Sequence, residues 1–121
     1  MIEGKRRHHN LQVWQLGMSV VEEVYALTRN FPNFETYGLC SQMQRSAVSI
    51  PSNIAEGAAR SGTKEFLHFL SIARGSLCEL ETQLMISQRL GYLSNELTIL
   101  KTVNELFAKL NALIAALKEK V

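Results

Sequence analysis

The sequence contains no aspartate, and all eleven of its acidic residues are glutamate. Aspartate is a poor residue for a helix interior because its short side chain competes for nearby backbone groups, so its absence is consistent with a mostly helical chain. The absence also removes the carboxylate that many phosphoryl-transfer sites use. Only His68 lies inside the expected fold, so no Ser–His–acid set can be assembled either. The composition therefore favours a protein that is not an enzyme.

Cysteine is scarce, with only Cys40 and Cys78 in the chain. They lack CxxC spacing and a cluster of histidine partners, so we expect two buried free thiols and no zinc site. Glu65 and His68 form one Glu-x-x-His pair, but a dimetal site inside a helical bundle needs a second such pair. We expect no metal and no other cofactor.

Long hydrophobic runs are missing too. No apolar stretch reaches the roughly 20 residues that span a bilayer, and the polar, basic start of the chain is not followed by an apolar signal segment. The glycines are scattered singly, which excludes a phosphate-binding loop of the GxxxxGK[ST] type. We expect a cytoplasmic protein without a membrane partner.

What is present is a chain of 121 residues, 46% of them hydrophobic and 20% charged, which fits one globular domain. We divide it into a loose basic arm at residues 1–10 and a single domain at residues 11–121. Lys5, Arg6 and Arg7 in the arm could contact phosphate, but a short frayed terminus is the commoner outcome.

Apolar residues recur at helical spacing in four segments, at about residues 11–30, 35–58, 64–90 and from 95 onward. The short turns between them imply antiparallel neighbours, so we predict an all-α, up-down-up-down four-helix bundle. Asn10 and Ser94 are candidate N-caps for the first and fourth helices. Gly91 is placed to end the third helix, and Gly75 inside it suggests the close approach of another backbone.

Pro51 lies in the middle of the second predicted helix. A proline there lacks the N–H that would bond to the Ala47 carbonyl, at a cost of roughly 3 kcal/mol in an ordinary helix interior. Hydroxyl and amide side chains can occupy backbone groups that a proline frees, so we predict a kinked helix with local polar repair. Gly57 follows as a stop or loosening point. The predicted structural polar cluster consists of Ser49, Pro51, Asn53 and Glu56.

The net charge is only +2, so a nucleic-acid site would need local clustering of basic residues. The candidates on the second and third helices and their connecting turn are Arg45, Arg60, Lys64 and Arg74. An antiparallel pair brings this turn to one end of the bundle, where part of the set could contact phosphates. Ordinary solvated charge is an equal alternative, with Glu56 placed four residues before Arg60 for a helical ion pair. Most aromatic residues fall on core stripes, so no base-stacking platform is expected.

Several segments carry a resemblance to a known family. They include Leu-Gln-Val-Trp-Gln at residues 11–15, Tyr-Gly-Leu at 37–39, Ser-Ile-Pro-Ser-Asn-Ile-Ala-Glu-Gly at 49–57 and Leu-Gly-Tyr-Leu at 90–93. The chain resembles the four-helix bundle proteins encoded by rRNA intervening sequences. The string at 49–57 is the most specific of these matches.

The resemblance implies a homopentamer arranged around a central channel and no enzymatic activity. It also implies a relation to the accessory variability proteins of diversity-generating retroelements, which bind nucleic acid and a reverse transcriptase through basic surfaces. The near-neutral net charge of this chain departs from that branch. We therefore expect an oligomeric interaction module that acts on structured RNA or on a nucleic-acid–protein complex. The alternative is a scaffold that binds only proteins.

Overall fold

The computed structural model describes residues 6–121, and these residues form helices joined by turns, with no strand among them. The elements are η1 (Arg7–Asn10), α1 (Gln12–Thr28), η2 (Asn33–Glu35), α2 (Leu39–Ala58), α3 (Thr63–Arg89) and α4 (Ile99–Lys118), where η denotes a 3-10 helix. The predicted all-α class is confirmed.

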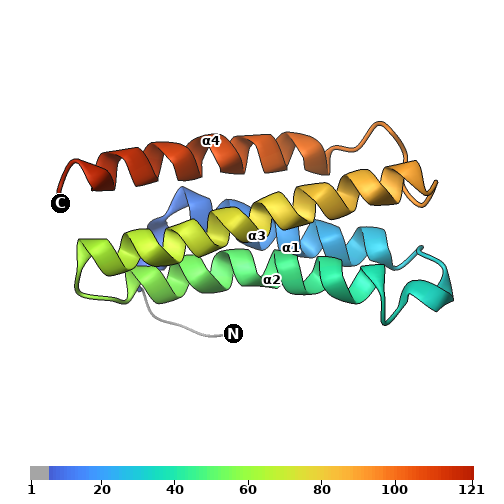
Figure 1. Cartoon of the computed structure of the whole chain (residues 1–121), viewed down its shortest axis with the longest axis horizontal. Coiled ribbons are helices and arrows are strands. Elements are labelled where there is room, and N and C mark those ends of the chain that lie inside the picture. Colours follow the sequence, from blue (N-terminus) through green and yellow to red (C-terminus); the bar gives the residue numbers. More distant parts are fainter. Residues whose placement is uncertain (1–5) are drawn as a thin grey trace.

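The four long helices lie side by side, and the chain reverses direction at each turn between them (Figure 1). Among the described elements, α2 contacts α1 and α3, and α4 contacts α3 and α1, whereas the diagonal pairs do not meet. The order of the helices around the bundle therefore follows their order in the sequence.

Each helix buries one apolar stripe in a shared core. The apolar spacing of the third helix predicts a core stripe, which is buried in the structure except at the half-buried Phe69: Phe66, Phe69, Leu70, Ala73, Leu77, Leu80 and Leu84. The largest side chains with less than 2% exposure include Met43, Ile50, Ile54, Leu70, Leu77, Leu80, Leu84, Ile99, Leu106 and Leu110. Within each helix these residues recur at intervals of three, four or seven positions, so the core follows directly from the periodicity of the sequence.

The predicted N-caps at Asn10 and Ser94 are wrong. Asn10 ends the 3-10 helix η1, and α1 begins at Gln12 with Leu11 as its N-cap. The Ser94 hydroxyl accepts a hydrogen bond from the Glu96 N–H (3.1 Å), and α4 begins only at Ile99. In contrast, Gly91 ends α3 as predicted, and its φ of 80° lies in the left-handed region that glycine adopts readily.

The start of α2 at Leu39 is later than the sequence suggested. Glu35 belongs to η2, and its carboxylate accepts hydrogen bonds from the Leu39 N–H (3.1 Å) and the Tyr92 hydroxyl (3.0 Å). Partial burial, together with the hydrogen bond and the negative charge of Glu35, raises the pKa of Tyr92. This cluster joins the beginning of α2 to the end of α3.

Pro51 is buried within α2, which continues through it without interruption. Asn53 Nδ2 donates to the Ser49 carbonyl (2.8 Å) and to the Ser49 hydroxyl (2.9 Å). The described hydrogen bonds of Ser49 and Asn53 therefore lie among themselves and to Ser76, and not to the Ala47 carbonyl whose partner the proline removes. The kink itself stays a prediction.

Gly57 and Gly75, two of the three glycines inside the long helices, differ in what surrounds them. Gly57 lies in the last turn of α2, which ends one residue later at Ala58, and a Cβ added at Gly57 would lie 2.7 Å from the Cβ of Phe69 on α3. An added Cβ at Gly75 would have no atom within 4 Å apart from its chain neighbours and its own helix backbone, so no other described helix of this chain approaches closely at this position. The tight contact between backbones lies between α2 and α3 at Gly57.

Polar contacts also connect α2 to α3 inside the bundle. The Ser46 hydroxyl donates to Gln83 Oε1 (2.8 Å), and the hydroxyls of Ser49 and Ser76 lie 2.8 Å apart. Ser46, Ser76 and Gln83 are buried, and no buried side-chain nitrogen or oxygen of residues 6–121 lacks a hydrogen-bond partner. The α2–α3 pair therefore combines apolar packing with satisfied polar contacts.

The two cysteines differ from each other in exposure. Both thiols are free; Cys40 is buried as predicted, whereas Cys78 lies on the outer face of α3 and is exposed. Burial raises the pKa of the Cys40 thiol, and the nearby Glu35 carboxylate adds to the shift. In the part of the chain that the structure describes, no helix has the length and apolar character needed to cross a bilayer.

Candidate nucleic-acid interface

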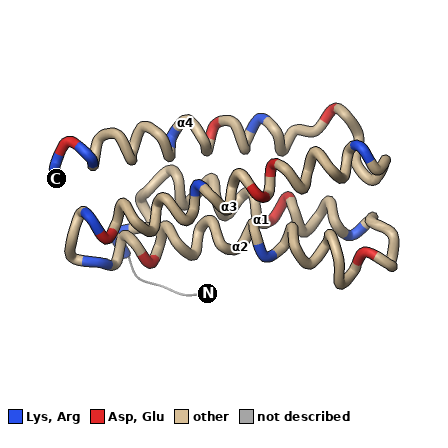
Figure 2. The backbone as a smooth tube through the Cα atoms, viewed as in Figure 1, with Lys and Arg blue, Asp and Glu red and all other residues tan. Residues whose placement is uncertain are grey.

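Three parts of the chain that are distant in sequence meet at one end of the bundle: η1, the last turn of α2 and the first turn of α3. Lys and Arg residues gather there at the α2–α3 turn (Figure 2). Arg60 and Lys64 line one shallow pocket of about 310 Å³, together with Glu65, His68 and Phe69. The structure thus brings together two of the four basic residues proposed from the sequence.

Two phenyl rings of α3 form the base of this end. Phe66 and Phe69 flank Gly57 of α2, because an added Cβ at Gly57 would lie 3.0 Å from Phe66 Cδ1 and 2.7 Å from Phe69 Cβ. The missing side chain of Gly57 therefore allows both phenylalanines to approach the end of α2 closely.

The guanidinium group of Arg60 packs on Phe69. Its Cζ atom lies 5.0 Å from the ring centroid, and its Nη2 atom lies 3.5 Å from Glu56 Oε1. The predicted helical ion pair is therefore present. With both side chains roughly half exposed to water, an ion pair of this kind contributes only about 0.3–0.5 kcal/mol.

Arg7 makes the matching contact on the other ring. Its Cζ atom lies 4.9 Å from the Phe66 centroid, and its Nη1 atom donates to the Ala58 carbonyl (3.3 Å). Ala58 is the last residue of α2, where the free carbonyls carry partial negative charge that favours a cation. The described part of the expected loose arm is therefore attached to the bundle, while Lys5 lies outside the described residues.

The histidines of η1 hold this segment in place. The rings of His8 and His9 pack against Trp14 of α1, with centroids 5.1 and 5.2 Å away. Partial burial lowers the pKa of His8, and the charges of His9 and Arg6 lower it further. The two imidazole rings therefore pack against α1 and do not form an open pair of metal ligands.

The other two proposed residues lie elsewhere. Arg45 precedes Arg60 by 15 positions, about 22 Å along a helix, and lines a pocket with Tyr25 of α1. Arg74 donates from Nη1 to Asn111 Oδ1 of α4 (2.9 Å). The four basic residues thus do not form one patch. Sequence reasoning named Arg7 only as a possible phosphate contact on a loose arm. It did not place Arg7 at this end of the bundle, because its contacts with Ala58 and Phe66 join residues more than 50 positions apart.

Comparison with known proteins gives one result. The family model for 23S rRNA-intervening sequence proteins matches residues 9–116, which is nearly the whole chain. The chain belongs to this family. A search of curated proteins finds no match.

Metal-binding side chains are not gathered in the described part of this 23S rRNA-intervening sequence protein. Within residues 6–121, no three His, Cys, Asp or Glu side chains lie together as metal ligands would. Glu65 and His68 are both exposed on the first turns of α3. The candidate site is therefore the end of the bundle that carries Arg7, Arg60 and Lys64, which we call the basic end.

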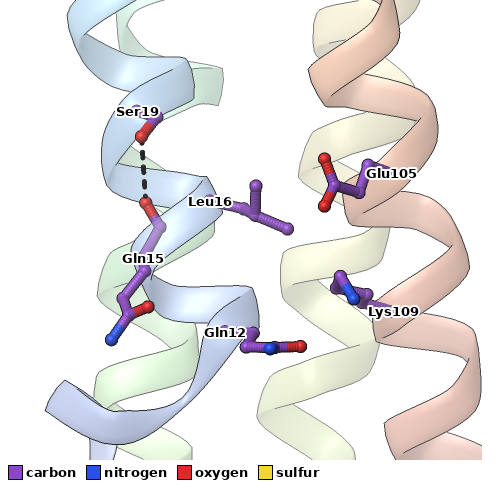
Figure 3. Close-up of a pocket in the computed structure, with 6 residues that line it drawn as sticks. All are labelled: Gln12, Gln15, Leu16, Ser19, Glu105 and Lys109. Carbon is purple, nitrogen blue, oxygen red and sulfur yellow. Dashed lines mark hydrogen bonds between the residues drawn. The ribbon is translucent and has the colours of Figure 1, made fainter.

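A second hollow lies between α1 and α4, where Leu16 points across the gap toward Glu105 and Lys109 (Figure 3). The pocket measures about 270 Å³ and is lined by Gln12, Gln15, Leu16, Ser19, Glu105 and Lys109. Its single Glu and single Lys balance each other, so the pocket offers no excess charge to a phosphate group.

Proposed function

We propose that this family member is a cytoplasmic, non-enzymatic interaction module that binds structured RNA, alone or in a nucleic-acid–protein complex, through its basic end. The observation that supports the proposal is the meeting of Arg7, Arg60 and Lys64 at the α2–α3 turn. Three cations within one end of a small domain provide contacts to several phosphates, although the net charge of the chain is close to zero.

The local charge balance supports moderate binding that depends on salt. Glu56 and Glu65 lie beside the three cations, so the net local charge is small. Phosphate contacts by Lys and Arg release counterions from the nucleic acid, and the affinity then falls as salt rises.

Removing the cations is expected to weaken RNA binding. For three phosphate contacts, the logarithm of the binding constant should fall with the logarithm of salt concentration with a slope of about −2 to −3. Lys64→Ala should make that slope shallower by about one unit. Fluorescence anisotropy of a labelled RNA hairpin across a salt series measures both quantities.

Arg45→Ala provides a matched control, because it removes an exposed cation from α2 at a distance from the proposed site. It should leave both the affinity and the slope unchanged. The same loss with Arg45→Ala and Lys64→Ala would mean that binding follows total charge, and the proposal would then be abandoned.

A second candidate is a scaffold that binds only proteins, including copies of itself. It is favoured by an exposed apolar surface on α1 and α2, where Met18, Tyr25 and Val48 are each about 40% exposed. The family resemblance adds the proposal of a homopentamer. An exposed apolar surface of this kind is typical of a protein–protein contact.

Solution mass tests the oligomer. Light scattering after size exclusion should give a multiple of the 13.6 kDa chain mass, and five times that mass under the pentamer proposal. Val48→Glu places a charge on the exposed α1–α2 surface and should reduce that mass to a single chain. If the wild-type protein has the mass of a single chain, the proposal of an oligomer is wrong, and the pentamer with it.

A further inference from the structure

We propose that the guanidinium groups of Arg7 and Arg60 form a stacking platform for unpaired bases, so that the basic end binds single-stranded RNA in preference to duplex. The inference rests on the proposed function and specifies which form of RNA the same site takes. It was not expected from the sequence, because the two phenylalanines involved follow the pattern of core residues.

The phenyl rings orient the two guanidinium groups. Each Cζ atom lies about 5 Å from a ring centroid, Arg7 over Phe66 and Arg60 over Phe69. A cation at this distance from a ring is attracted by the negative face of the ring. Arg7 is further held by its hydrogen bond to the Ala58 carbonyl, so its position is largely fixed before a ligand arrives.

The side chains of Arg7 and Arg60 both remain accessible to water while they contact the rings. Arg7 is exposed, and 44% of the Arg60 side chain is accessible to water. Unpaired RNA bases stack readily on Arg planes, whereas bases inside a duplex already stack on their neighbours and cannot offer their faces. The geometry therefore favours loops, bulges and free strands.

Lys64 and Glu56 complete the site with opposite effects. Lys64 lines the same pocket as Arg60 and has no planar group, so it serves the phosphate beside a stacked base. Glu56 lies 3.5 Å from Arg60 Nη2 and competes with that phosphate. Removing the Glu56 charge should therefore strengthen binding.

The test separates the flat shape of the guanidinium from its charge. Fluorescence anisotropy is measured at low salt with a short labelled poly(A) strand and with an RNA duplex of the same length. Wild type should bind the single strand at least about tenfold more tightly than the duplex.

Arg60→Lys keeps the positive charge but loses the planar guanidinium group. It should weaken strand binding about tenfold, nearly as much as Arg60→Ala. Glu56→Gln should strengthen strand binding about two- to fivefold.

Arg45→Lys is the matched control and should bind as wild type does. A contrary result is that Arg60→Lys matches wild type in its affinity for the strand while Arg60→Ala binds more weakly. That result would mean that the site recognises charge alone. It would overturn the stacking platform but leave the proposed RNA binding intact. Equal affinity of wild type for strand and duplex also overturns the platform. Absence of binding to either RNA at low salt overturns the proposed function together with this inference. Circular dichroism of each variant confirms that the helices are retained.

Discussion

Replacing Leu80 by alanine is expected to lower the free energy of unfolding by about 2–5 kcal/mol, because the substitution leaves a cavity that the bundle cannot fill. Leu80 has no exposed surface and lies midway along α3, which packs against both α2 and α4. For a chain of this length, about 1 kcal/mol corresponds to about 4 °C in melting temperature. Urea denaturation at a fixed protein concentration measures the change.

Met85→Ala is the matched control on the same helix. Met85 is 50% exposed, so its truncation should change the free energy of unfolding by no more than about 0.5 kcal/mol. Equal losses for the two variants would contradict the assigned core, or would show that another chain covers the outer face of α3 in solution. Repeating the measurement at several protein concentrations separates these two explanations.

Gly57→Ala is expected to destabilise the protein by about 1–3 kcal/mol and to weaken RNA binding at the same time. The added methyl group would lie 2.7 Å from Phe69 Cβ, an atom attached directly to the α3 backbone that cannot rotate away. α2 and α3 must therefore move apart, and the two phenylalanines that carry Arg7 and Arg60 move with α3. Thermal denaturation and the anisotropy assay measure the two effects.

Gly75→Ala makes the same chemical change at a site with free space. Beyond its chain neighbours and its own helix backbone, no described atom lies within 4 Å of the added Cβ, so the higher helix propensity of alanine should stabilise the protein by about 0.5–1 kcal/mol. If Gly57→Ala also stabilised the protein, the close approach of α2 and α3 would be wrong. Comparison of Gly57→Ala with Gly75→Ala thus separates the effect of the close α2–α3 contact on stability from the effect of helix propensity.

Periodicity predicted the parts of the fold that depend on burial. The stripes of α3 and α4 identified the core because leucine and isoleucine recur with the helical repeat. Helix starts were less predictable, since they depend on the local path of the chain. Asn10 and Ser94 have the right chemistry for caps, yet one belongs to a 3-10 turn and the other to an irregular segment that continues to Thr98.

The site was predictable only where its residues are near in sequence. Arg60 and Lys64 flank one turn, so an antiparallel bundle necessarily places them at one end. Arg7 joins them through contacts with Ala58 and Phe66, which no sequence spacing indicates. The roles of the two phenylalanines were hidden because a ring can fill the core with one face and support a cation with the other.

The buried polar contacts between α2 and α3 fix how the two helices are aligned at the basic end of the bundle. Two helices joined only by leucines can slide past each other by one turn, 5.4 Å, and still bury similar surfaces. Such a slip would separate Ser46 from Gln83 and Ser49 from Ser76, at about 1–3 kcal/mol for each buried group left unpaired. The alignment of Gly57 with the phenyl rings is thus maintained by serines and a glutamine located several turns away.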